Sequence, residues 1–150
     1  MLSKLEATGR GYQGLWSAFS NSKPAHHGLA AFAAYEAAER QKYAQQIAQH
    51  LAEHGQHVQY GAIPAPTCDF KSPAEAMDVA CTMEDETMQA AVAVYDAVID
   101  GGERPYFLGG LIQSMEHDRK ELAEVKSMLA GATSPEQMTA LNRHLLQKYA

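Results

Sequence analysis

Glu84 is a carboxylate on the otherwise apolar side of a long predicted helix, where it could pair with a cation or bind a metal ion. The residues that share its side at helical spacing are apolar or aromatic: Met77, Cys81, Met88, Ala91, Tyr95 and Val98. A buried, unpaired carboxylate is strongly destabilising. We therefore expect a cation, a metal ion or a hydrogen-bond network to face Glu84.

Helical periodicity covers nearly the whole chain and predicts the elements that must position Glu84. The predicted helices are residues 3–20, 27–54, 73–100, 105–130 and 135–150. The third and fifth have clear start signals, because Ser72 and Ser134 are each followed by proline and then, at the third position, by Glu75 and Gln137. These serines are expected to cap the helices.

The first predicted helix has an apolar side and three glycines. The apolar side is formed by Leu2, Leu5, Tyr12, Trp16 and Phe19. Gly9, Gly11 and Gly14 each weaken a helix by up to about 1 kcal/mol. We interpret them as positions where another part of the chain approaches the backbone closely.

The segment 55–73 contains three prolines and no periodic pattern, and it is too long for a tight turn. It is typical of a crossover along the surface of a helical bundle. Two hairpins of long helices joined by one crossover predict an all-α four-helix bundle with a short C-terminal fifth helix. We expect residues 1–150 to form a single domain.

Composition narrows the possible partners and locations. The formal net charge of −6 argues against nucleic acid, which favours a basic surface. No apolar run approaches the roughly 18 residues that a membrane-spanning helix needs. The first residues lack the apolar core of a secretory signal, so we expect a cytoplasmic location and no membrane partner.

Three segments resemble non-haem ferritins. The second helix contains ERQKYAQQI, its end and the crossover read HLAEHGQHVQYGAIPAPTCDFKSPAEAM, and the fourth helix contains PYFLGGLIQSMEHDRKEL. The resemblance covers nearly the whole chain and implies a ferritin-like bundle that stores or handles iron. It also implies a homo-oligomer, for which a 24-subunit cage is one form. Haem is not expected, because methionine at helical spacing usually fills a core.

The resemblance implies where a ferroxidase centre would lie. Members of the family build it from a Glu on the first helix, Glu-x-x-His on the second, Glu on the third and Gln or Glu on the fourth. Two irons need such hard oxygen ligands and an imidazole. Matching positions are Glu6 on the first helix, within one residue, and Glu84 on the third. On the fourth, Met115 takes the Gln position, and Asp118 follows three residues later.

The second helix departs from the family pattern. Counted back from Gly55, Arg40 takes the Glu position and Tyr43 takes the His position. A shift by one residue restores Glu39, but it places Lys42 at the His position and still provides no histidine. The first register agrees better with the apolar side of this helix. An Arg40–Glu84 ion pair could then fill the space of the irons, as a basic residue does in family subunits that oxidise iron poorly.

The sequence therefore predicts an iron-storage or iron-handling subunit with an incomplete or altered ferroxidase centre. The candidate metal ligands are Glu6, Glu39, Glu84 and Asp118, with Glu36 in the wider acidic set. Weak ferroxidase activity stays open, and no catalytic residue is assigned. The alternatives are a structural or partner-binding bundle of the same fold without iron, and a small bundle that acts outside a cage.

Overall fold

The computed structural model describes all 150 residues and contains five helices and no strand. The helices are α1 (Leu2–Asn21), α2 (His27–Glu53), α3 (Pro73–Asp100), α4 (Tyr106–Gly131) and α5 (Pro135–Tyr149). Each predicted boundary lies within one residue of the observed one, so the predicted all-α class is confirmed. None of the helices is both long enough and apolar enough to span a membrane.

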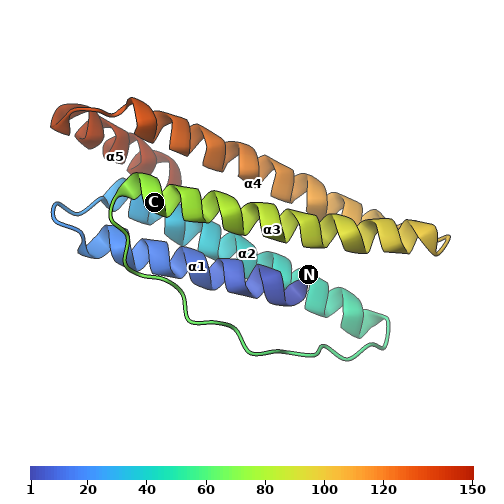
Figure 1. Ribbon diagram of the computed structural model, residues 1–150. Helices are drawn as coiled ribbons and strands as arrows, with labels where there is room; N and C mark the ends of the chain where they lie inside the picture. Colours follow the sequence, from blue (N-terminus) through green and yellow to red (C-terminus); the bar gives the residue numbers. More distant parts are fainter.

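Two antiparallel hairpins form the bundle. α1 packs against α2, and α3 packs against α4, with α1 also packed against α3 (Figure 1). The crossover returns the chain to the end of the bundle where α2 begins, so α3 runs parallel to α2. α5 folds back at the end of α4 and packs mainly against α2. This is the predicted four-helix bundle with one long crossover and a short fifth helix.

The predicted start signals operate as caps. Ser72 Oγ accepts a hydrogen bond from the backbone N–H of Glu75 over 3.1 Å. Ser134 Oγ accepts one from the N–H of Gln137 over 3.2 Å, and Gln137 Oε1 accepts the N–H of Ser134 over 3.1 Å. These bonds satisfy N–H groups that have no partner inside the helix. They therefore fix where α3 and α5 begin.

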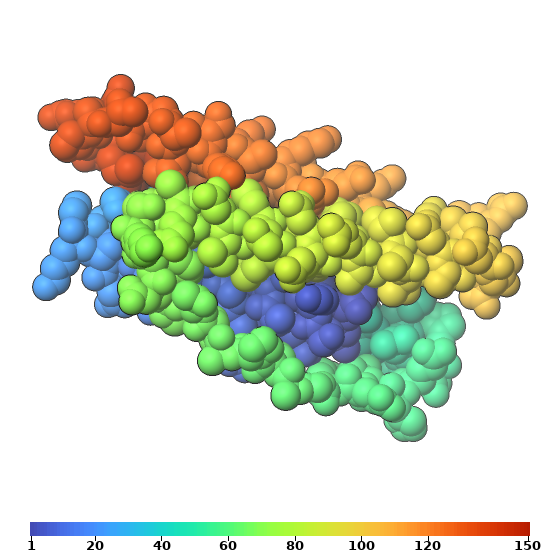
Figure 2. All heavy atoms as spheres, viewed as in Figure 1, coloured from blue at the N-terminus to red at the C-terminus, as the bar shows by residue number.

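The crossover, residues 54–72, lies along the surface beside α1 (Figure 2). Gly14 on α1 permits this contact, because a Cβ atom there would lie 2.3 Å from the carbonyl oxygen of Thr67. The interpretation of Gly14 as a point of close approach is confirmed. The crossover thus lies over α1 and returns the chain to the end of the bundle where α2 begins, so that α3 can run parallel to α2.

α5 is attached to the first turn of α2 through Gly28 and Asn142. Asn142 Oδ1 accepts the backbone N–H groups of Gly28 and Leu29 over 2.9 and 3.2 Å. A Cβ atom at Gly28 would lie 2.2 Å from the carbonyl oxygen of Asn142. The absence of a side chain at residue 28 therefore allows α5 to supply the cap that α2 lacks.

Two apolar clusters fill the bundle. One lies toward α5 and includes Tyr12, Phe32 and Leu122. The other lies toward the α3–α4 turn and includes Leu5 and Met115. The buried polar side chains are Thr8, Glu36, Arg40, Glu84, Thr87 and Asp118. These polar side chains come from all four long helices.

The prediction that Trp16 faces the core is wrong. Trp16 is 49% exposed, whereas Leu15 is 1% exposed and takes the inner position one turn after Tyr12. Positions three and four residues after Tyr12 are both near its face of the helix, and the sequence pattern did not distinguish them. Here the smaller side chain fills the space inside the bundle.

Candidate functional site

Arg40 lies at the centre of the buried polar side chains and has no exposed surface. The spacing of Glu36, Arg40 and Tyr43 places all three on the inner face of α2, where each is at most 4% exposed. The guanidinium of Arg40 also lies over the rings of Tyr12 and Tyr43, 5.7 and 5.5 Å from their centroids. The inward register of Arg40 and Tyr43 is thereby confirmed.

Glu84 on α3 faces Arg40 directly. Arg40 Nε donates to Glu84 Oε1 over 2.9 Å, and Nη2 donates to the same oxygen. Glu84 is 1% exposed, and its Oε2 accepts no hydrogen bond. Charge-assisted bonds of this kind are stronger than neutral ones. The expected ion pair between Arg40 and Glu84 is confirmed.

Asp118 on α4 is the second acceptor. Its Oδ2 accepts a hydrogen bond from Arg40 Nη1 over 2.9 Å and another from Tyr43 Oη over 2.6 Å. Burial, and then the hydrogen bond and negative charge of Asp118, raise the pKa of Tyr43 well above its ordinary value. The phenol therefore stays protonated and acts as a donor.

Glu36 is the least satisfied member of the site. Its Oε2 lies 3.0 Å from Arg40 Nη2, but neither carboxylate oxygen accepts a hydrogen bond. Burial raises the pKa of Glu36 to about 8 despite the opposing effect of Arg40, and the charges of Asp118 and Glu84 add to the increase. For Arg40, burial alone would lower the pKa, but the charges of Glu84, Tyr12 and Glu36 together with the hydrogen bond to Glu84 outweigh burial, so the pKa of Arg40 is raised.

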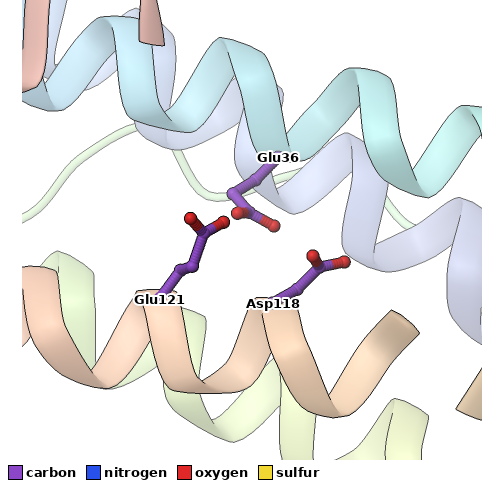
Figure 3. Close-up of side chains that lie close together, drawn as sticks. All are labelled: Glu36, Asp118 and Glu121. Atoms are coloured by element: carbon purple, nitrogen blue, oxygen red, sulfur yellow. The ribbon is translucent and has the colours of Figure 1, made fainter. Parts of the chain in front are cut away.

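A group of carboxylates lies beside Arg40. Oxygens of Glu36, Asp118 and Glu121 all lie within 4.8 Å of one another. Figure 3 shows Glu36 pointing from α2 toward Asp118 and Glu121 on α4. The Glu121 side chain is 13% exposed, and Lys148 Nζ on α5 lies 3.1 Å from its Oε1. This is the one group of three His, Cys, Asp or Glu residues in the chain with that spacing.

The four predicted ligands are not brought together. Glu84 and Asp118 both contact Arg40. Glu39 is half-buried and lies 3.5 Å from Lys42. Glu6 is half-buried and lines a surface pocket between α1, α2 and the crossover, because Leu5 takes the inner position. Metal binding by this set stays a prediction.

Sequence reasoning missed two residues of the site. Glu121 lies three residues after Asp118, and this spacing on one helix face was a usable signal. Tyr12 was assigned to the apolar side, but its Oη is buried near Glu84 and Glu36 without a hydrogen-bond partner. Burial, followed by the charges of these two carboxylates, raises the pKa of Tyr12.

The arrangement favours ion pairing over binding of two metals. Arg40 uses oxygens of both Glu84 and Asp118, which a metal would otherwise use. Met115, at the predicted Gln position, is fully buried in the apolar cluster with Leu5. None of the seven histidines is buried, so none provides an imidazole inside the bundle.

No protein-family model matches this sequence, and no curated protein matches it. Solved structures do match. A closed form of the Archaeoglobus fulgidus ferritin, engineered by site-directed mutagenesis, is 14% identical with a TM-score of 0.89, covering 96% of this chain and 88% of that one. A ferritin from the green alga Ulva pertusa is 22% identical with a TM-score of 0.83, covering 96% and 78%. These likenesses show that the chain has the ferritin fold.

Proposed function

We propose that this chain is a ferritin-like subunit for iron storage or iron handling, with an altered ferroxidase centre. The observation that carries this proposal is the position of Arg40, which is fully buried between Glu84 and Asp118. The ferritin fold supports the general role, and Arg40 supports the alteration. Iron in this proposal is the cargo of the protein.

Arg40 opposes iron binding at the centre in two ways. Its N–H groups occupy oxygens of Glu84 and Asp118 that would be iron ligands. Its fixed positive charge also repels a metal cation at short range, where the surroundings exclude water. Expelling the guanidinium would break a buried network, which typically costs about 3–5 kcal/mol.

The chemistry of oxidation needs more than carboxylates. A two-iron centre uses hard oxygen ligands, imidazole and open positions for oxygen. In this chain Tyr43 stands at the position that the resemblance assigns to the imidazole, and its hydroxyl donates a hydrogen bond to Asp118. We therefore expect iron to be oxidised slowly by this bundle, and storage to depend on assembly of a homo-oligomer, with a 24-subunit cage as the candidate form. A cytoplasmic location is part of the same proposal.

Ferrous iron tests the proposal directly. Fe²⁺ is added anaerobically to the purified protein, air is admitted, and ferric absorbance and iron retained per chain are followed. We expect oxidation little faster than in buffer, with iron retained by an assembled particle. Arg143→Glu, an exposed charge change on α5, is the matched control for later variants of Arg40.

Other outcomes would decide against parts of the proposal. Rapid oxidation with about two irons bound per chain at low loading would contradict the altered centre. A particle that neither retains nor oxidises iron would support the structural or partner-binding alternative. Analytical ultracentrifugation of the same sample distinguishes a cage from a small bundle. Sedimentation as a small bundle would contradict the predicted assembly.

A further inference from the structure

The interface between α2 and α4 holds carboxylates that the Arg40–Glu84 pair does not account for. Glu36 lies one helical turn before Arg40 on α2, and oxygens of Glu36, Asp118 and Glu121 lie within 4.8 Å of one another. Asp118 and Glu121 project from the same face of α4, and Glu36 meets them from α2 (Figure 3). Three carboxylates at this spacing can share one ion.

Glu36 lacks the hydrogen bonds that a buried carboxylate normally has. It has no exposed surface and neither of its oxygens accepts a hydrogen bond, although Oε2 lies 3.0 Å from Arg40 Nη2. Figure 3 shows that this carboxylate points into the group. Both bonds to Asp118 end on Oδ2, which leaves Oδ1 for another partner. Buried polar atoms without hydrogen bonds are destabilising, so Glu36 Oε1 and Asp118 Oδ1 favour an additional cation beside Arg40.

The buried charges do not balance. Glu84 and Asp118 carry two negative charges against the one positive charge of Arg40, and a cation that displaced the proton of Glu36 would face an excess of two negative charges. A divalent cation would cancel this excess. Glu121 already has Lys148 at 3.1 Å and would complete the ligand set from the more exposed side.

We propose that Glu36, Asp118 and Glu121 bind one divalent cation that prefers oxygen ligands. Such cations include Mn²⁺, Mg²⁺, Ca²⁺ and Fe²⁺. The site shares Asp118 with the centre that Arg40 fills but uses Glu36 and Glu121 in place of Glu84, so Arg40 remains paired with Glu84 when the cation is bound. The proposal does not rest on the iron-storage function, because it requires neither oxidation nor assembly.

Lys148 makes the proposal unusually testable. Its ammonium group lies where it competes with a cation for Glu121. Lys148 is exposed on α5, so its replacement leaves the buried network intact. Lys148→Gln is therefore expected to strengthen cation binding, whereas a variant that merely loosened the fold would weaken it.

Mn²⁺ is the probe, because its bound and free forms differ in electron paramagnetic resonance. The number of Mn²⁺ ions bound per chain can also be measured after equilibrium dialysis. We expect about one Mn²⁺ per chain in the unaltered protein. Glu121→Gln and Glu36→Gln should each weaken binding about tenfold or more. Glu124→Gln, an exposed carboxylate on the same helix, should leave binding unchanged. Lys148→Gln should increase affinity severalfold.

Three outcomes would overturn the site. One is equal Mn²⁺ affinity in Glu121→Gln and the unaltered protein, and another is weaker binding in Lys148→Gln. The third is absence of bound Mn²⁺ at about 1 mM, a concentration that fills even weak sites. Circular dichroism checks each fold, and Glu121→Gln keeps the test decisive if Glu36→Gln does not fold. Slow or fast iron oxidation leaves all of these results unaffected.

Discussion

Arg40 on α2 donates two N–H groups to a single oxygen of Glu84 on α3, and neither side chain is more than 1% exposed. The pair joins the two helical hairpins across the centre of the bundle. Asp118 on α4 extends it through its own bond to Arg40. One guanidinium therefore connects three of the four long helices and occupies the space where carboxylates could otherwise hold metal.

Replacement of Arg40 by methionine should strongly destabilise the metal-free protein. The change leaves Glu36, Glu84 and Asp118 buried without a cation, and breaking such a network costs about 3–5 kcal/mol. Urea unfolding measures the loss. Arg143→Met, an exposed change of the same type, should cost less than about 0.5 kcal/mol. Similar losses in both variants would contradict the central role of Arg40.

Replacement of Tyr43 by phenylalanine should remove one hydrogen bond and little packing. Asp118 Oδ2 loses the Tyr43 hydroxyl at 2.6 Å but retains Arg40 at 2.9 Å. A bond to a charged acceptor contributes about 1.5–3 kcal/mol, and thermal or urea unfolding can resolve that amount. Tyr106→Phe is the control, because Tyr106 is 76% exposed. A Tyr43 variant as stable as the control would argue against this bond.

The stability of the metal-free protein should depend on pH through Glu36. The folded pKa of about 8 lies above the ordinary value of 4.5, so between these values the folded protein binds more protons than the unfolded chain. Stability from this group is therefore complete below about pH 4.5 and is lost as pH rises through about 8. The slope for one proton is about 1.4 kcal/mol per pH unit.

Other groups around Glu36 also titrate or carry charge, so the comparison must be with Glu36→Gln. The facing groups are Tyr12, Arg40, Glu84, Asp118, Glu121 and Tyr149. Urea unfolding from pH 5 to 9 in the presence of a chelator should show a loss of stability that Glu36→Gln largely removes. Parallel pH profiles for the two proteins would contradict the raised pKa of Glu36.

Replacement of Gly28 by alanine should displace α5 from α2. A Cβ atom there would meet backbone atoms of Asn142 at 2.2 to 2.7 Å, and the backbone cannot move aside without moving α5. We expect a loss of more than about 1 kcal/mol and faster hydrogen exchange in α5. Gly110→Ala is the control, because nothing lies within 4 Å of that position and alanine favours a helix. Equal effects of the two changes would contradict close packing at Gly28.

The helices and their arrangement could be predicted because each depends on local signals. Ser72 and Ser134 mark helix starts, and the crossover follows from its prolines and length. The pairing of Arg40 with Glu84 followed from two inward positions on separate helices. In these cases the pattern along one helix was enough to identify the face that is buried.

The rest depended on how the helices stack along the bundle axis. Leu15 and Trp16 follow Tyr12 by three and four residues and both lie near its face of the helix, so the pattern did not separate them. The ligand position on the first helix was matched only to within one residue, which did not separate Glu6 from the buried Leu5. Glu121 meets Glu36 only because of the axial offset between α2 and α4, which no pattern within one helix specifies. The spacing of Asp118 and Glu121 on one helix face was a usable signal, but their meeting with Glu36 was visible only in three dimensions.

The most direct test of the altered centre is to restore the missing ligands. Arg40→Glu combined with Tyr43→His replaces the guanidinium beside Glu84 by a carboxylate and supplies an imidazole on the side of Asp118. The aerobic Fe²⁺ assay then compares this double variant with the unaltered protein and with Arg143→Glu. If Arg40 blocks the centre, the initial rate should increase about tenfold or more and ferrous iron should stabilise the variant. A folded double variant with no increase in rate or iron binding would contradict the account.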